Sequence, residues 1–163
     1  MIERKRAMFG LGKKREKEKP ELLELKNIRL NCTPMEKDDV IREAGRMLYE
    51  SGYVDEAYIE AMLKRELTFA TNIGNGIALP HGVEEAKKEI RRSGIAVMVF
   101  PEGTDWGGEK VKLVIGIAGV GEDHLEILAT IADRLADPSA VEQITSCSRE
   151  EIYDIFTGKG SQK

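Results

Sequence analysis

Two apolar runs dominate the pattern of hydrophobic and polar positions along the chain. Residues 93–100 read SGIAVMVF and residues 112–120 read KLVIGIAGV. Both runs are too short for buried helices and are bounded by turn residues, which is typical of central strands covered on both faces. The segment between them, residues 101–108, is predicted to be a loop or an edge hairpin. Alternating apolar and polar residues predict one further short strand at residues 28–32.

Helical spacing of apolar residues predicts helices in much of the remaining chain. Residues 33–36 form a capping box of the Thr-x-x-Glu type, with proline at the first helical position. Asp55 is predicted to cap a second helix that ends near residues 65–66, and residues 83–90 could form a short, highly charged helix. The first helix is predicted to place five apolar side chains on one face: Val40, Ile41, Ala44, Met47 and Leu48.

Three more helix starts are visible in the C-terminal third of the chain. Asp123 is predicted to cap one helix, Asp137-Pro138 begins a short one, and a Ser-x-x-Glu box at Ser148 opens a last helix that ends at Gly158. The alternation of helices with buried strands predicts an α/β fold, a three-layer sandwich. The helix after Asp123 is predicted to line one side with Leu125, Leu128, Ala129, Ala132 and Leu135.

The composition fits one globular domain, with 163 residues of which 41% are hydrophobic. The formal net charge of −4 is uneven, because residues 1–19 hold eight Lys and Arg against three Glu, which leaves −9 for the rest. An acidic body with a basic end argues against a nucleic-acid reader, and a solvated tail is favoured over a lipid-binding one. We expect a basic flexible tail or linker at residues 1–24, a domain at 25–158 and a C-terminal tail at 159–163.

Cysteine usage and hydropathy point to the cytoplasm. Cys32 and Cys147 have neither metal-like spacing nor a disulfide framework. Cys147 is interpreted as a packing residue, with a thiol nucleophile as the alternative. No segment reaches the roughly 18 apolar residues of a membrane helix, and the basic amino end lacks an apolar core for a signal peptide.

The residues that could carry chemistry are few. The sequence has no glycine-rich phosphate loop, no dinucleotide fingerprint, no His-Glu-x-x-His and no paired cysteine ligands, so no cofactor and no metal are predicted. In residues 74–82, GNGIALPHG, an apolar triplet runs into Pro80, His81 and Gly82. Proline fixes its own φ and glycine permits unusual backbone angles, so His81 is held between two constraints. His81 is interpreted as a phosphoryl carrier, with a histidine that merely satisfies a turn as the alternative.

His124 is the other histidine of the chain. With Asp123 as cap it would lie in the first turn of a helix, just beyond the carboxyl end of strand 112–120, where ligands of open α/β sheets gather. The helix dipole there favours an anion and a neutral imidazole, which could donate an N–H to a phosphoryl oxygen. Arg65 either satisfies the last carbonyls of its helix or binds phosphoryl oxygens. Trp106 fits an exposed partner contact and a lid on the core equally well.

The motif GNGIALPHG, followed later by GVGEDHLEIL after an apolar strand, resembles the enzyme IIA domain of the bacterial phosphoenolpyruvate-dependent sugar phosphotransferase system. The resemblance is to the mannitol/fructose type and runs from about Leu25 to Phe156. The segments PEGTDWGGEKVKLVIGIAG and YVDEAYIEAMLKREL are most similar to the mannitol branch.

The resemblance implies a mostly parallel five-stranded sheet with helices on both faces. It implies that His81 is the phosphorylated nucleophile, with His124 as a hydrogen-bond donor to the phosphoryl group and Arg65 as a stabiliser of its oxygens. It also implies a phosphotransferase component that accepts phosphate from phospho-HPr and passes it to the cysteine of an enzyme IIB domain or IICB transporter. Contact with the membrane would occur only through that transporter.

Two other functions remain as alternatives. One is a regulatory phospho-switch of the nitrogen-type or transcription-regulator-associated IIA class. The other is a small metal-dependent hydrolase that uses both histidines, although two histidines without a carboxylate set are few ligands. The sequence leaves open the sugar and whether the chain is a free subunit or part of a fused transporter.

Overall fold

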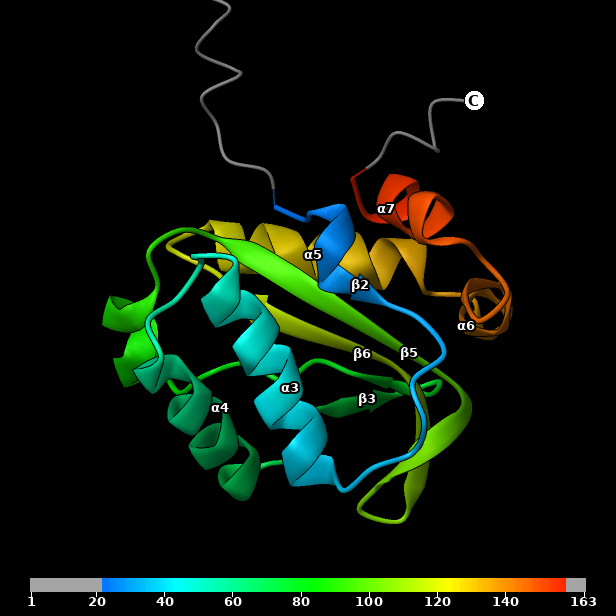
Figure 1. Cartoon of the computed structure of the whole chain (residues 1–163), viewed down its shortest axis with the longest axis horizontal. Helices are drawn as coiled ribbons and strands as arrows, with labels where there is room; N and C mark the ends of the chain where they lie inside the picture. Colours follow the sequence, from blue (N-terminus) through cyan, green and yellow to red (C-terminus); the bar gives the residue numbers. More distant parts are fainter. Residues whose placement is uncertain (1–21, 158–163) are drawn as a thin grey trace, which may run out of the picture.

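A five-stranded sheet forms the middle layer of the structure, a computed structural model that describes residues 22–157 (Figure 1). The two apolar runs form its two longest strands and have neighbours on both sides, as predicted. The strand order is β2-β5-β6-β4-β3. The strands are β2 (Ile28–Arg29), β3 (Asn72–Gly74), β4 (Ile77–Ala78), β5 (Gly94–Trp106) and β6 (Glu109–Ala118).

The sheet is mixed, so the expectation of a mostly parallel sheet holds for only part of it. β2 pairs with β5 and β4 with β6 in parallel, whereas the β5–β6 and β3–β4 pairs are antiparallel. The reason lies in residues 101–108, which are too few for the crossover that a parallel pair needs. They extend the strands instead, so that Thr104 pairs with Val111 and Trp106 with Glu109 in a hairpin.

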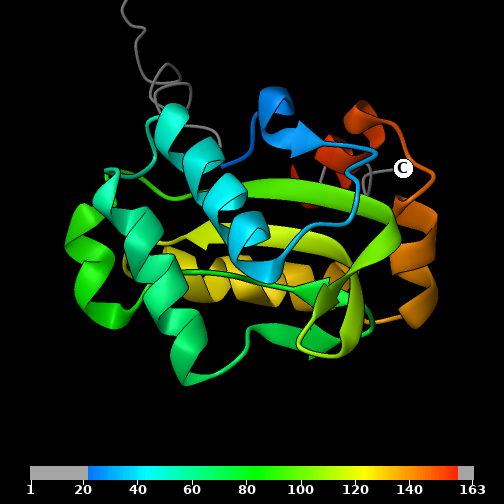
Figure 2. The same ribbon diagram turned by 60° about the horizontal axis from the view of Figure 1, so that its bottom comes forward.

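Helices cover both faces of the sheet (Figure 2). Helices α3 and α4, with the 3-10 helix η2, pack on one face, and α5, α6 and α7 pack on the other. A further 3-10 helix, η1, leads into β2. Their bounds are η1 (Leu25–Asn27), α3 (Lys37–Glu50), α4 (Ala57–Thr68), η2 (Glu84–Glu89), α5 (Asp123–Arg134), α6 (Pro138–Ile144) and α7 (Arg149–Thr157).

Alternation along the central strands builds the two cores. Successive side chains of a strand point to opposite faces. Ala96 and Met98 of β5 therefore pack with α3 and α4, whereas Ile95 and Val97 pack with the helices of the other face. Gly116 of β6 permits a close helix approach, because a Cβ there would lie 3.0 Å from the Cβ of Ala44. The predicted three-layer α/β sandwich is confirmed.

The predicted helix starts fared unequally. The Ser148 box is confirmed, because the backbone N–H of Glu151 donates to the Ser148 hydroxyl at 3.1 Å and the Ser148 N–H donates to the Glu151 carboxylate at 2.8 Å. Asp137 also caps α6 as predicted. The box at residues 33–36 is wrong, since α3 begins at Lys37 without a side-chain cap. Asp55 is not a cap either and pairs with Arg91.

The predicted buried side of the helix after Asp123 is only partly correct. Leu135 is buried and Leu128 packs against the core, as predicted, whereas Leu125 is 67% exposed and Ala129 and Ala132 are exposed. The main buried residues of α5 are instead Ile127 and Ile131. Both stripes have helical spacing, but the observed one carries larger side chains, so burying it removes more apolar surface from water. Asp123 does not cap this helix either, because Glu122 holds the N-cap position and no side chain caps it. The Asp123 carboxylate instead accepts a hydrogen bond from the Ser93 hydroxyl at 2.8 Å.

Most of the predicted N-terminal tail, the C-terminal tail at residues 159–163 and the helix end at Gly158 lie outside the described residues. Within the described range, Leu23 is fully buried and the Leu22 carbonyl accepts from the N–H of Ile95 at 2.9 Å. Among the helices of residues 22–157, none combines the length and the apolar character that crossing a membrane requires.

The observed face of α5 predicts a contrast between two aliphatic truncations. Ile131→Ala should lower the free energy of unfolding by about 2–5 kcal/mol, because it leaves a cavity under the sheet. Leu125→Ala should change that free energy by no more than about 0.5 kcal/mol. Urea unfolding followed by circular dichroism measures both. Equal losses in the two variants would show that the helix is rotated relative to the register described above.

Candidate functional site

The segment that carries His81 extends β4 along β6. An isolated parallel bridge joins His81 to Ile117, and the N–H of Ile117 donates to the Pro80 carbonyl at 2.9 Å. On the other side, the N–H of Leu79 donates to the Thr71 carbonyl at 3.0 Å. His81 is therefore fixed by backbone pairing. The sequence analysis expected a fixed position but gave another reason for it, because Gly82 does not adopt a positive φ and instead leaves room for the ring of Tyr58.

The ring of His81 has a defined orientation. Its Nδ1 lies 2.8 Å from the carbonyl oxygen of Leu79. A carbonyl can only accept, so Nδ1 carries the hydrogen and donates it. In the neutral imidazole this leaves the lone pair on Nε2. The half-buried ring thus presents one defined nucleophilic nitrogen.

His124 lies beside His81 at the same edge of the sheet. Because β4 and β6 are parallel, their carboxyl ends meet, and α5 begins just after β6 ends. The ring centroids of the two histidines are 5.4 Å apart, with their planes inclined at 59°. Gly119 permits this approach, because a Cβ there would lie 2.6 Å from the Cα of His124. The structure brings together the two histidines that the sequence singled out.

The surroundings of both rings favour neutral imidazoles. Burial lowers the pKa of His81, and the nearby charges of Arg65 and Lys87 lower it further, against an opposing effect of the Leu79 carbonyl. Burial also lowers the pKa of His124, helped by the charges of Lys87 and His81. At neutral pH both rings can therefore act without first losing a proton.

Arg65 lies in the last turns of α4, close enough to contribute to the lowered pKa of His81. Its guanidinium donates to the carbonyl of Phe69, the residue that ends the helix, at 2.9 Å. This is the helix-end role that sequence analysis gave as one alternative. The half-buried side chain also places a positive charge near the candidate nucleophile, so the structure is compatible with both interpretations.

A buried carboxylate beside Arg65 was missed by the sequence analysis. Glu66 is 6% exposed and accepts from the N–H and the hydroxyl of Thr71 at 2.9 and 2.7 Å. It also accepts from the indole N–H of Trp106 at 2.9 Å, and the Lys37 ammonium lies 3.7 Å away. Trp106 is 1% exposed, which decides between its two interpretations in favour of the core.

Lys87 was also missed, although its charge acts on both histidines. It belongs to η2, the charged segment that follows His81 directly, and its side chain is half-buried. The only sequence feature that could have singled out Lys87 was its place in a charged run. Such runs usually form solvated faces, so this feature did not indicate a site residue.

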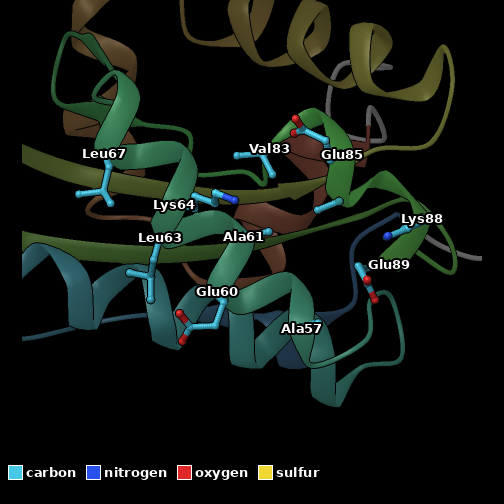
Figure 3. Close-up of a pocket in the computed structure, with 11 residues that line it drawn as sticks. Ala57, Glu60, Ala61, Leu63, Lys64, Leu67, Val83, Glu85, Lys88 and Glu89 are labelled. Atoms are coloured by element: carbon cyan, nitrogen blue, oxygen red, sulfur yellow. The ribbon is translucent and has the colours of Figure 1, made fainter.

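A groove of about 500 Å³ lies next to the site, between α4 and the segment from Val83 to η2. Figure 3 shows Glu60, Lys64 and Leu67 of α4 on one wall, with Val83 and Glu85 among the residues opposite. The lining of this groove includes none of His81, His124 and Arg65. The candidate nucleophile thus lies outside this groove.

The alternative chemistries gain no support from the described residues. The Cys147 thiol donates to the Gln143 carbonyl at 3.2 Å, and burial raises its pKa, which disfavours a thiolate nucleophile. In the part of the chain that the structure describes, no three His, Cys, Asp or Glu side chains are grouped as metal ligands.

Comparison with known proteins gives the family. Residues 21–159 match the family described as "Phosphoenolpyruvate-dependent sugar phosphotransferase system, EIIA 2". The chain belongs to this enzyme IIA family. It is 44% identical over 138 residues to the "Mannitol-specific phosphotransferase enzyme IIA component" of Bacillus subtilis (strain 168), an alignment that covers 83% of this chain and 96% of that protein. The protein of the same name from Staphylococcus aureus (strain N315) is 43% identical over 137 residues, covering 83% and 95%.

Solved structures of enzyme IIA agree with the fold. The crystal structure of IIA mannitol from Escherichia coli aligns with a TM-score of 0.75 and 34% identity, over 82% of this chain and 97% of that one. The complex of the same IIA with phosphorylated enzyme IIB gives a TM-score of 0.77, also at 34% identity, over 84% and 99%. The family resemblance drawn from the histidine motifs is therefore confirmed.

The environment of the two histidines in this IIA domain predicts their titration. Both imidazoles should titrate below the ordinary value of 6.5, because burial and neighbouring cations oppose protonation. As the pH falls below about 6.5, the unfolded chain binds protons before the folded one, so the folding stability contributed by these residues declines with acidification. Carbon-detected NMR of the ring signals measures both midpoints. A midpoint above 6.5 for His81 would contradict the described surroundings.

Proposed function

We propose that this IIA domain is the phosphocarrier of a mannitol-type transport system. It accepts a phosphoryl group from phospho-HPr on His81 and passes it to the cysteine of an enzyme IIB domain, in the cytoplasm. The mannitol-specific names of its relatives support the sugar, and the solved complex of a related IIA with phosphorylated IIB supports the acceptor.

The observation that carries the proposal is the orientation of the His81 ring. Nδ1 is occupied by the Leu79 carbonyl, so Nε2 is the nitrogen that attacks phosphorus. Its lone pair forms the new P–N bond while the P–N bond of the donor phosphohistidine breaks, and the donor nitrogen keeps the bonding pair. In the second step the IIB thiolate attacks phosphorus, and the electron pair returns to Nε2 of His81. In the first step one P–N bond replaces another, so transfer between the donor phosphohistidine and His81 is reversible.

The neighbours of His81 act on the transferring group. His124 donates a ring N–H to a phosphoryl oxygen, and Arg65 stabilises the oxygens through its charge, turning from the Phe69 carbonyl toward them. Phosphoryl transfer has a loose transition state in which positioning and electrostatic stabilisation supply most of the catalysis. The site thus requires no cofactor or metal of its own.

The second candidate is a regulatory phospho-switch. The nitrogen regulatory protein IIA-Ntr from Neisseria meningitidis shares the fold, with a TM-score of 0.70, but only 25% identity. The higher identity to mannitol-specific proteins favours the transport role. Transfer of phosphate from the phosphorylated chain to a purified mannitol IIB domain separates the two: a regulatory module would accept phosphate and fail to pass it on.

Exposed apolar side chains near the site fit transient protein partners. Leu125 directly follows His124, and Leu67 and Phe69 lie within four residues of Arg65, with exposures of 67%, 87% and 70%. Contiguous exposed apolar groups mark interaction surfaces on soluble proteins, and these three side chains flank the proposed site residues in sequence. HPr and IIB are proposed to dock here in turn.

Removing the proposed nucleophile should have a different effect from removing its neighbours. With phosphoenolpyruvate, enzyme I and HPr present, His81→Ala should take up no acid-labile phosphate. His124→Ala and Arg65→Ala should still be phosphorylated at His81, but on the order of a hundredfold to a thousandfold more slowly, because each removes an electrostatic donor. Quench-flow uptake and mapping of the adduct measure rate and position.

His124→Gln serves as the matched variant for the hydrogen-bond role, since it keeps a neutral N–H donor. It should retain more activity than His124→Ala, and equal rates would remove that role. Stoichiometric phosphate on His81→Ala would overturn the nucleophile, and full activity of Arg65→Ala would leave Arg65 with its helix-end contact alone.

If HPr docks on these apolar side chains, a charged residue introduced there should weaken its binding. Leu125→Asp should raise the HPr concentration needed for half-maximal transfer by on the order of tenfold, with little change at saturation. Leu25→Asp, at another exposed leucine in η1, is the control and should behave like the unchanged protein. Steady-state transfer assays measure both. Loss of all transfer at moderate salt would instead show that charge steering dominates the encounter.

A further inference from the structure

The hydrogen-bond ladder between the His81 segment and β6 contains an inserted side chain. A parallel bridge between His81 and Ile117 is normally closed by two backbone bonds, from Ile117 N–H to the Pro80 carbonyl and from Gly82 N–H to the Ile117 carbonyl. The first is present at 2.9 Å. In place of the second, Gly82 N–H donates to the hydroxyl of Tyr58 at 2.9 Å, and that hydroxyl donates to the Ile117 carbonyl at 2.9 Å.

Tyr58 is built into this position. It comes from α4, is 3% exposed, and its ring lies against Gly82, where an added Cβ would meet the ring at 2.6 Å. Burial raises the pKa of Tyr58 to about 12, so the hydroxyl keeps its hydrogen at neutral pH and can donate while it accepts. The hydroxyl therefore satisfies two buried backbone groups that would otherwise pair with each other.

The insertion has a geometric consequence for the reacting nitrogen. The Tyr58 hydroxyl takes the place of the backbone bond that would join Gly82 to Ile117, immediately after His81. Tyr58 and Arg65 are seven residues apart, which places them on nearly the same face of α4. The Tyr58 hydroxyl thus links α4, the helix that carries Arg65, to the backbone of Gly82 next to His81 and to the backbone of Ile117 in β6.

We propose that Tyr58 is a positioning residue for phosphoryl transfer: its hydroxyl, inserted between Gly82 N–H and the Ile117 carbonyl, sets the direction of His81 Nε2 and the place of Arg65 relative to it. This role rests on the proposed function of His81 as the phosphoryl carrier. Tyr58 itself touches no reacting atom. Without the hydroxyl, the Gly82 N–H bonds either directly to the Ile117 carbonyl or to a water molecule. Both changes shift the backbone next to His81 and therefore the position of its ring.

Tyr58→Phe tests the role, because it removes the hydroxyl and keeps the ring. Single-turnover transfer from saturating phospho-HPr should slow on the order of tenfold to a hundredfold, since misplacing a reacting group by about 1 Å costs that much. The titration midpoint of His81 and the amide signal of Gly82 should shift in the same variant. Gly82→Ala displaces the Tyr58 ring from the other side and should reproduce both effects.

Thr104→Val is the matched control for loss of a buried hydroxyl. The Thr104 hydroxyl also lies between two backbone groups, accepting from Met35 N–H at 3.0 Å and donating to the Met35 carbonyl at 2.7 Å. Thr104 pairs with Val111, six residues from Ile117 along β6, or roughly 20 Å at the rise of a strand. This variant should lose stability while its transfer rate and the His81 midpoint stay unchanged.

The readouts separate this role from the proposed function. If the unchanged protein takes up no phosphate, the phosphocarrier function fails, and the NMR signals still report whether Tyr58 orients His81. Tyr58→Phe with the original transfer rate and an unshifted His81 midpoint would overturn the positioning role. A loss of stability like that of Thr104→Val, with an unchanged transfer rate and no shift at His81, would assign Tyr58 to stability alone.

Discussion

The parallel pairing of β4 with β6 is the constraint on which the site depends. Ile77 pairs with Leu113, and four residues later His81 pairs with Ile117 in the same register, although Pro80 lies between them. Proline has no N–H to donate, but its carbonyl still accepts from Ile117, so the pairing continues past the end of the regular strand. Both carboxyl ends then reach one sheet edge. Without that register the two histidines would lie at unrelated places.

Local chemistry made part of this arrangement predictable. The central strands, the family and the meeting of His81 with His124 follow from short apolar runs and from proline and glycine at fixed positions. What the sequence could not provide depends on choices between similar alternatives. The apolar residues of α5 form two stripes of helical spacing, and only packing shows that the stripe without Leu125 is buried. The antiparallel β5–β6 pair could have been inferred from the short connection between the two strands, but the expectation drawn from the family resemblance was a mostly parallel sheet.

Long-range polar contacts were beyond prediction. Glu66 and Trp106 are 40 residues apart in sequence, and no sequence motif predicts that they are in contact. A buried carboxylate is costly unless its hydrogen bonds are satisfied, and Glu66 has three donors and the Lys37 ammonium around it. The network fixes the last turns of α4 against the β5–β6 hairpin. Adjacent residues thus differ in surroundings, because Glu66 faces the core while Arg65 lies near His81.

Partial burial reconciles two requirements on His81. Full exposure would leave the pKa of the imidazole near its ordinary value, and a sizeable fraction would carry a proton and be unable to attack. Complete burial would close Nε2 to a protein partner. Burial and the nearby cations keep the half-buried ring neutral by lowering its pKa, while the Leu79 carbonyl engages Nδ1 and leaves Nε2 reachable. In the proposed relay, a phosphoryl group on Nε2 would place a dianion beside the same cations, which would attract it. The charges that, with burial, keep the imidazole neutral before transfer would therefore also stabilise the proposed phosphorylated state after it.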